Sequence, residues 1–168
     1  GPIFTDFLLA DEINRAPTRS QSPFLQAMEE GYVAADGVNQ PLSNLFTVIA
    51  TQNPIDFDRT NPLPEAQLDR FLTSISLGYP DVEAKLHLLG EYSDAAKRDP
   101  VAVLDKASVA ALHDACDDVH LHADLARYIV TLARTTREDP NMKLGISPRG
   151  SMHLASACNS EHLSPEPT

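Results

Sequence analysis

No apolar run in the sequence approaches the roughly 18 residues that a membrane-spanning helix needs. The first residues also lack the basic segment and the following apolar stretch of a signal peptide. Together these absences predict a cytoplasmic protein without a membrane span. Basic residues are scarce too: 13 Lys and Arg stand against 24 Asp and Glu, for a net charge of −11. A general nucleic-acid-binding surface is therefore not expected, because phosphate neutralisation needs clustered basic side chains, although the net charge does not bear on a single local basic site.

Several catalytic and metal-binding patterns are also missing. The two cysteines, Cys116 and Cys158, lie far apart without CxxC spacing, which favours reduced thiols packed in helices. The six histidines form no HExxH or similar ligand spacing, so His120 and His122 are interpreted as loop and capping residues. No Ser stands in a GxSxG context. These absences argue against a zinc enzyme and against a serine hydrolase of that type.

The first half of the 168-residue chain has a mixed α/β pattern. Residues 3–10 and the run "LFTVIA" read as buried strands, and "TSISLGYP" alternates like a third strand near Ser74–Leu77. Between the first two strands along the chain, Asp36-Gly37 separates two short segments with β-forming residues and indicates a hairpin. A helix is expected from near Ser22 to the stop at Gly31, because Pro23 is tolerated only in a first turn. A short helix is expected over Glu65–Phe71.

The second half, from Pro80 onward, has the pattern of an all-helical bundle of about four helices. Helix starts are indicated by residues that suit N-caps, namely Asp81, either Asp105 or Ser108, His122, and Ser147 before Pro148. The polar, proline-rich tail from about residue 160 is expected to be frayed. The chain therefore divides into residues 1–79 and 80–168, and no internal repeat is visible.

Two carboxylates, Asp11 and Glu12, directly follow the first strand in "FLLADEINRAP". An apolar strand that ends in Asp-Glu is the pattern of a Walker B strand, in which the Asp holds a Mg²⁺ ion, usually through water, and the Glu polarises the attacking water. The plainer interpretation is a strand end followed by a helix cap. Asn53 ends the next strand, where it either bonds a water or a phosphate at the carboxyl ends of the strands or serves as a turn residue before Pro54.

Two arginines also stand out. Arg70, on the short second helix, either pairs with Asp69 or Glu65 or projects to a neighbouring subunit as an arginine finger. Arg149 stands in the first turn of the last helix, where a basic side chain opposes the helix dipole. That position suits an arginine that holds an anion, although an arginine solvated by water is the plainer interpretation.

Taken together, these motifs closely resemble the MoxR family of AAA+ ATPases from Gly1 to about Leu154. The similarity is carried, in this order, by "GPIF", "LLADEINRAP", "QAMEEGYV", "FTVIATQNP", "LPEAQLDRF", "LGYP" and "SPRGS". The resemblance implies Asp11 and Glu12 as Walker B, Asn53 as sensor 1, Arg70 as the arginine finger and Arg149 as sensor 2. It implies the second half of an AAA+ core of the P-loop NTPase, ASCE type, with a hairpin before sensor 1 in residues 31–45 and a helical lid domain after Pro80.

The resemblance also implies a function. The family hydrolyses ATP with Mg²⁺ in rings that are usually hexamers, and uses the energy for chaperone-like remodelling or maturation of client proteins. Partners often contain a von Willebrand factor A domain.

The sequence departs from the family in one major way: it contains no GxxxxGK[ST] loop, which the family places before the segment that matches Gly1. Without that loop the chain has no backbone cradle or Lys for the β- and γ-phosphates. The strand near Ser74–Leu77 is then expected to lack its neighbour. We therefore expect this chain to be the C-terminal part of a longer ATPase and to be inactive alone. Smaller departures are Pro23 and Gly150, where the family favours better helix formers, and the sequence after Ser156.

Two other functions remain to be weighed. The first is a non-catalytic protein-interaction module derived from an AAA+ domain, which would need no phosphate-binding loop. The second is an unrelated Mg²⁺-dependent phosphohydrolase built on Asp11 and Glu12, which would leave Asn53, Arg70 and Arg149 unexplained.

Overall fold

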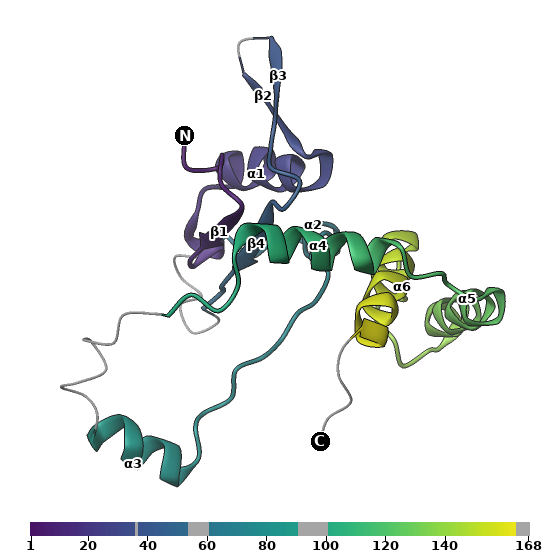
Figure 1. Cartoon of the computed structure of the whole chain (residues 1–168). Helices are drawn as coiled ribbons and strands as arrows, with labels where there is room; N and C mark the ends of the chain where they lie inside the picture. Colours follow the sequence, from purple (N-terminus) through teal and green to yellow (C-terminus); the bar gives the residue numbers. More distant parts are fainter. Residues whose placement is uncertain (36, 54–60, 91–100, 164–168) are drawn as a thin grey trace.

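The computed structural model describes residues 1–35, 37–53, 61–90 and 101–163, and Figure 1 shows the arrangement of their helices and strands. The first part is built on two parallel strands, β1 (Phe7–Ala10) and β4 (Thr47–Ala50), which pair from Phe7 opposite Thr47 to Ala10 opposite Ala50. The two strands predicted around Asp11 and Asn53 are thus confirmed as neighbours. Their carboxyl ends meet at one edge of the sheet.

One face of this sheet is covered by α1 (Thr18–Glu30), which follows the single 3₁₀ turn η1 (Ile13–Arg15). The small core of the first part consists of Ile13, Leu25 and Leu63, with Ala10 and Ala50 packed against it from the sheet. The opposite face stays open, because Phe7, Leu9 and Ile49 are all more than half exposed. The alternation along both strands therefore gives the sheet one packed and one exposed apolar face.

The start of α1 differs from the prediction: the helix begins at Thr18, not near Ser22, and Pro23 lies inside it. The Pro17 carbonyl accepts the Gln21 N–H at 3.1 Å, and the buried Gln21 side chain donates to three backbone carbonyls around the helix start. These bonds fix the first turn and outweigh the one backbone hydrogen bond that proline removes.

The predicted hairpin is confirmed by the antiparallel pair β2 (Tyr32–Ala35) and β3 (Val38–Pro41). Gly31 ends α1 in the left-handed region at φ 69°, and its carbonyl accepts the Leu42 N–H at 2.8 Å to close the base of the hairpin. Figure 1 shows the hairpin projecting away from the rest of the chain. Asp36 itself lies outside the described residues.

The third strand expected near Ser74–Leu77 is wrong: residues 73–81 form no strand. β1 and β4 pair only with each other in the described part of the chain, so this segment has no ladder to join. Its apolar side chains are left outside, and Ile75 and Leu77 are 83% and 90% exposed. The short helix before it, α2 (Glu65–Leu68), ends earlier than the predicted Phe71.

Four helices follow, as predicted: α3 (Val82–Gly90), α4 (Lys106–Asp117), α5 (Ala123–Glu138) and α6 (Pro148–Leu163). The tail was expected to fray from about residue 160, but α6 continues to Leu163, and the rest of the tail lies outside the described residues. No helix within the described ranges is both long and apolar enough to cross a membrane.

Each of these helices begins at a predicted capping residue, because a side chain there accepts a backbone N–H of the first turn. Asp81 and Asp105 accept the N–H of Ala84 and Ser108, each at 2.8 Å. This decides between Asp105 and Ser108 in favour of Asp105. Further on, Nδ1 of His122 accepts the Asp124 N–H at 3.2 Å, and Oγ of Ser147 accepts the Gly150 N–H at 2.9 Å.

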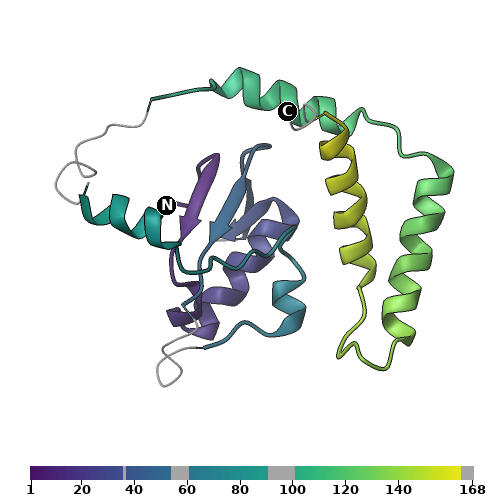
Figure 2. The same ribbon diagram turned by 90° about the horizontal axis from the view of Figure 1, so that it is seen from below.

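The four helices do not form one bundle. α6 packs against α4 and α5 (Figure 2), whereas α3 lies apart from them in Figure 1. The apolar side chains Val82, Leu86 and Leu89 of α3 are 58–76% exposed. The predicted bundle fails at α3 because no described residue covers the apolar side of that helix.

Candidate functional site

The first candidate site lies at the carboxyl ends of β1 and β4. It consists of Asp11, Glu12, Thr51 and Asn53, which we call the carboxylate site. Asp11 and Glu12 follow β1 directly, and the paired strand β4 delivers Thr51 and Asn53 beside them. The register explains this placement, because Ala10 lies opposite Ala50 and the next residues of the two strands therefore meet.

Thr51 joins the two parts of the carboxylate site. Its hydroxyl accepts the backbone N–H of Glu12 at 2.9 Å and donates to Oδ1 of Asp11 at 2.5 Å. The Thr51 carbonyl also accepts the Ile13 N–H at 3.0 Å, which continues the pairing beyond the strands. Thr51 was not singled out from the sequence. The signal was its position one residue after β4, directly across from Asp11.

Glu12 has the one positive φ among the described residues other than glycine, with φ 47° and ψ 49°. The left-handed conformation is unfavourable for a residue with a side chain, so the surrounding contacts hold it there. Oε2 of Glu12 lies 3.0 Å from Nε of Arg15, and Oε1 accepts Nδ2 of Asn53 at 3.4 Å. The structure thus brings the predicted pair Glu12 and Asn53 into contact.

The buried amide side chains of Asn14 and Gln21 bond backbone carbonyls next to the carboxylate site. The Asn14 side chain, which is 6% exposed, donates to the Asn53 carbonyl at 3.0 Å. Gln21, which is 1% exposed, donates to the carbonyls of Ile13, Ala16 and Asn61 at 3.0–3.1 Å. Oδ1 of Asn14 and Oε1 of Gln21 have no hydrogen-bond partner among the described residues. The amide N–H groups nevertheless connect the backbone segments on both sides of the carboxylate site.

The carboxylate site offers one oxygen ligand for a magnesium ion. No group of three or more His, Cys, Asp or Glu side chains gathers as a metal site in the part of the chain that the structure describes. Magnesium, however, is commonly held by one or two carboxylates together with waters and substrate phosphates. Asp11 is exposed and its carboxylate is oriented by Thr51, so it offers one hard oxygen ligand of the required kind.

The second candidate site brings together Glu29, Asp69, Arg70 and Arg149, which we call the arginine cluster. Nη2 of Arg149 contacts Oε1 of Glu29, and Nη2 of Arg70 lies 3.4 Å from Oε2 of the same carboxylate. Nη1 of Arg149 lies 3.7 Å from Oδ2 of Asp69. All four side chains are 26–37% exposed. One carboxylate thus holds two guanidinium groups, one on each oxygen.

This pairing was not predicted from the sequence. Arg70 contacts Glu29 rather than Asp69 or Glu65, the partners considered for a structural role. Arg149 is not a solvated arginine, since it contacts two carboxylates of the first part of the chain. The acidic pair in "MEEG" at the end of α1 could have indicated a distant basic partner, because no Lys or Arg lies nearby in the sequence. The arginines that contact Glu29 are at least forty residues away along the chain.

Ser147 fixes the start of α6 in the arginine cluster. Its hydroxyl lies 2.7 and 2.8 Å from the two carboxylate oxygens of Asp69 and accepts the Gly150 N–H. The turn before it is equally constrained: Nε of Arg137 donates to the Ile146 carbonyl at 2.8 Å. A Cβ on Gly145 would lie 2.4 Å from Cγ of Arg137, so this turn accepts no larger residue without a shift.

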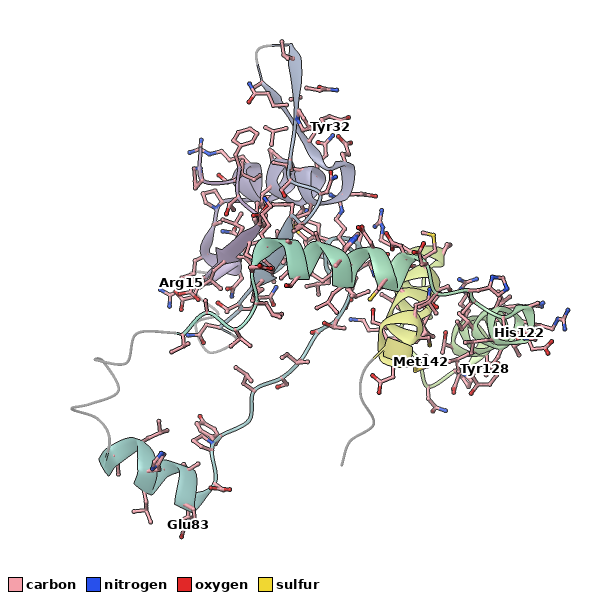
Figure 3. The ribbon with its side chains drawn as sticks, viewed as in Figure 1. Arg15, Tyr32, Glu83, His122, Tyr128 and Met142 are labelled. Atoms are coloured by element: carbon pink, nitrogen blue, oxygen red, sulfur yellow. The ribbon has the colours of Figure 1, made fainter. Side chains whose placement is uncertain are left out.

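The two candidate sites lie at opposite ends of α1. Glu12 precedes the helix and Glu29 stands near its end, and the 13 residues between Thr18 and Glu30 span about 20 Å at 1.5 Å per residue. Figure 3 shows the same separation, with Arg15 near the carboxylate site and Tyr32 just beyond the far end of α1. The structure therefore does not bring Arg70 and Arg149 to Asp11 and Glu12 of the same chain.

Comparisons with known proteins show what this chain is similar to. The model of the ATPase family associated with various cellular activities (AAA) matches residues 1–73. Chaperone MoxR1 of Mycobacterium tuberculosis (strain ATCC 25618 / H37Rv) is 36% identical over 95% of this chain and 45% of its own length. The uncharacterized protein YeaC of Bacillus subtilis (strain 168) is 42% identical over 97% of this chain and 51% of its own.

A solved structure gives the same result. A crystal structure from Cytophaga hutchinsonii ATCC 33406, of a protein assigned provisionally as an ATPase, matches with a TM-score of 0.83 and 34% identity. The match covers 95% of this chain and 52% of that one. This chain spans about half the length of the curated relatives that it matches.

Proposed function

Because the chain belongs to the MoxR-like AAA+ ATPases, we propose that it is the part of an ATP-hydrolysing, chaperone-like ATPase that supplies the water-activating carboxylate and two arginines. The observation that carries the proposal is the carboxylate site, where Glu12 and Asn53 meet beside Asp11 at the ends of two parallel strands. Open α/β sheets bind their ligands at this edge.

Each residue of the carboxylate site has a chemical role in this proposal. Asp11 would hold a Mg²⁺ ion, which would supply positive charge against the phosphates of ATP. Glu12 accepts a proton from the attacking water, and Asn53 keeps the Glu12 carboxylate aimed by its bond to Oε1. Thr51 holds Asp11 and the Glu12 backbone in a fixed relation, so that metal ligand and base act on the same phosphate.

The arginines act on a different nucleotide. Arg70 and Arg149 contact the far end of α1 from the carboxylate site, and the 13 residues of this helix span about 20 Å. A phosphate bound at Asp11 is out of their reach, so they serve the nucleotide of a neighbouring copy, with Arg70 as the arginine finger and Arg149 as sensor 2. This arrangement needs a neighbouring copy of the chain, and we propose that the copies form a hexameric ring.

The phosphate cradle comes from another segment of the longer protein in this proposal. The sequence has no GxxxxGK[ST] loop, and β1 and β4 pair only with each other among the described residues, so the outer edge of each strand is available for further strands. We propose a cytoplasmic location, a client protein that is remodelled or matured, and a partner with a von Willebrand factor A domain. The absence of the loop from the sequence also supports a second candidate, a non-catalytic interaction module derived from the same fold.

The experiment that separates these functions is Glu12→Gln in the full-length protein. We expect ATP turnover, measured by phosphate release, to fall about 10²- to 10⁴-fold, because the general base is lost. ATP binding should remain, since Gln keeps the shape of the side chain. Glu83→Gln on the exposed helix α3 removes the same charge elsewhere and should leave turnover unchanged.

Two outcomes would contradict the proposal. A full-length protein without ATP turnover would favour the interaction module. Turnover by the 168-residue chain alone, well above its own Glu12→Gln variant, would show that no further segment is needed.

A further inference from the structure

Glu29 occupies the place of an anionic ligand in the arginine cluster. Its two carboxylate oxygens each receive one guanidinium group, Arg149 on Oε1 and Arg70 on Oε2. A phosphate group presents its oxygens to paired arginines in the same way, because guanidinium groups bind carboxylate and phosphate with similar geometry. The two arginines are therefore already gathered as an anion-binding pair, and the anion that they hold belongs to the chain itself.

Glu29 does not satisfy all the hydrogen-bond donors of the two arginines. Nε of Arg70 is buried without a hydrogen-bond partner among the described residues, although the carboxylate lies 3.4 Å from Nη2. The Glu29 side chain is 37% exposed, and exposed ion pairs of this kind are weak. A stronger, multiply charged anion could thus displace it.

The neighbouring carboxylate does not share this role. Glu30 accepts a hydrogen bond from Nε2 of Gln26 at 2.8 Å. The bonds from Gln26 and Tyr32 and, to a smaller extent, the charge of Arg70 lower the pKa of the Glu30 carboxyl, but Glu30 forms no ion pair with either arginine of the cluster among the described residues. Glu30 is thereby committed to its own helix and to the start of β2, which makes it a matched control one residue away.

We propose that Glu29 is an intramolecular competitor of nucleotide phosphate: it holds Arg70 and Arg149 together until a phosphate group displaces it. The proposal rests on the function proposed above and names a regulatory residue outside the roles implied there. Displacement also has a mechanical consequence. Arg149 belongs to α6 and Glu29 to α1, so the exchange releases one contact between the helical part and the first part, while the Ser147–Asp69 contact remains.

The test is nucleotide affinity in the assembled full-length protein, measured by titration of a fluorescent, non-hydrolysable ATP analogue. Glu29→Gln removes the competing charge and should tighten binding roughly 2- to 30-fold, the range that corresponds to two exposed ion pairs. Glu30→Gln should bind like the wild type. In an Arg70→Ala/Arg149→Ala background, Glu29→Gln should change nothing, because no guanidinium is left to release.

The outcomes separate the two proposals. If the wild type binds the analogue and Glu29→Gln binds it equally or more weakly, competition by Glu29 is refuted while the ATPase stands. The same holds if the gain in affinity persists without both arginines, since Glu29 would then act elsewhere. A wild-type protein that binds no nucleotide refutes the proposed function, and the competition with it.

Discussion

The two polar sites at the ends of α1 are assembled in opposite ways. The carboxylate site comes from residues that directly follow two paired strands, and backbone bonds of Thr51 and buried amides fix it. The arginine cluster draws on α1, the end of α2 and the start of α6, joined only by partly exposed side chains. Sites of the first kind are rigid from the moment the sheet forms. Sites of the second kind can exchange partners without disturbing the fold.

The largest effect is expected at the exchangeable site. Arg70→Ala in the full-length protein should lower ATP turnover by about 10³-fold or more, because an arginine finger contacts the phosphate most strongly in the transition state, where charge develops. Nucleotide affinity should change far less. Arg134→Ala removes an equally basic but exposed side chain on α5 and serves as the control. Equal losses of turnover and affinity would argue against a finger.

A smaller effect is expected at the rigid site. Thr51→Val keeps the shape of the side chain but removes the hydroxyl that bonds Asp11 and the Glu12 N–H. Hydrogen bonds to charged groups contribute about 1.5–3 kcal/mol, so turnover should fall by roughly 10- to 100-fold. The magnesium concentration at half-maximal turnover should rise as well. Thr131→Val removes a comparable hydroxyl from the exposed face of α5 and should be silent. Normal turnover in Thr51→Val would show that the carboxylate site needs no such brace.

The smallest effect concerns the attachment of α6. Ser147→Ala removes the helix cap and the hydroxyl contact with Asp69. We expect the free energy of unfolding, measured by urea denaturation, to fall by about 1–2 kcal/mol. Ser151→Ala is the matched control, since that hydroxyl only bonds the carbonyl one turn earlier in α6. If both variants lost equal stability, the contact between Ser147 and Asp69 would contribute nothing of its own.

The difference between local and long-range contacts also determines which features could be predicted from the sequence. The strands that precede Asp11 and Asn53 and the caps at Asp81 and Ser147 were predicted, although β1 begins at Phe7 rather than at residue 3 and Asp105 was one of two candidates. Each depends on a few adjacent residues, and local chemistry determines them. The order of the motifs along the chain indicated the family, and the comparisons confirm it.

What the sequence could not predict depends on distant partners. The pairing of Glu29 with Arg70 and Arg149 joins residues far apart in the chain, and no spacing rule reveals it. The strand expected near Ser74–Leu77 has the correct alternation but no neighbour to pair with. The start of α1 was misplaced because the tertiary contacts of Gln21 override the local penalty at Pro23.

The left-handed backbone conformation of Glu12 lowers the stability of the fold, whereas the Glu12 side chain is needed for the proposed hydrolysis. At φ 47° a side-chain-bearing residue costs about 1–2 kcal/mol, a cost that Gly avoids and Asn partly avoids. A library sorted only for heat resistance should therefore accumulate Gly or Asn at this position and lose the base that the proposed hydrolysis needs. Glu12 is retained in this sequence against the preference of its own backbone, as expected where selection acts on chemistry rather than on folding.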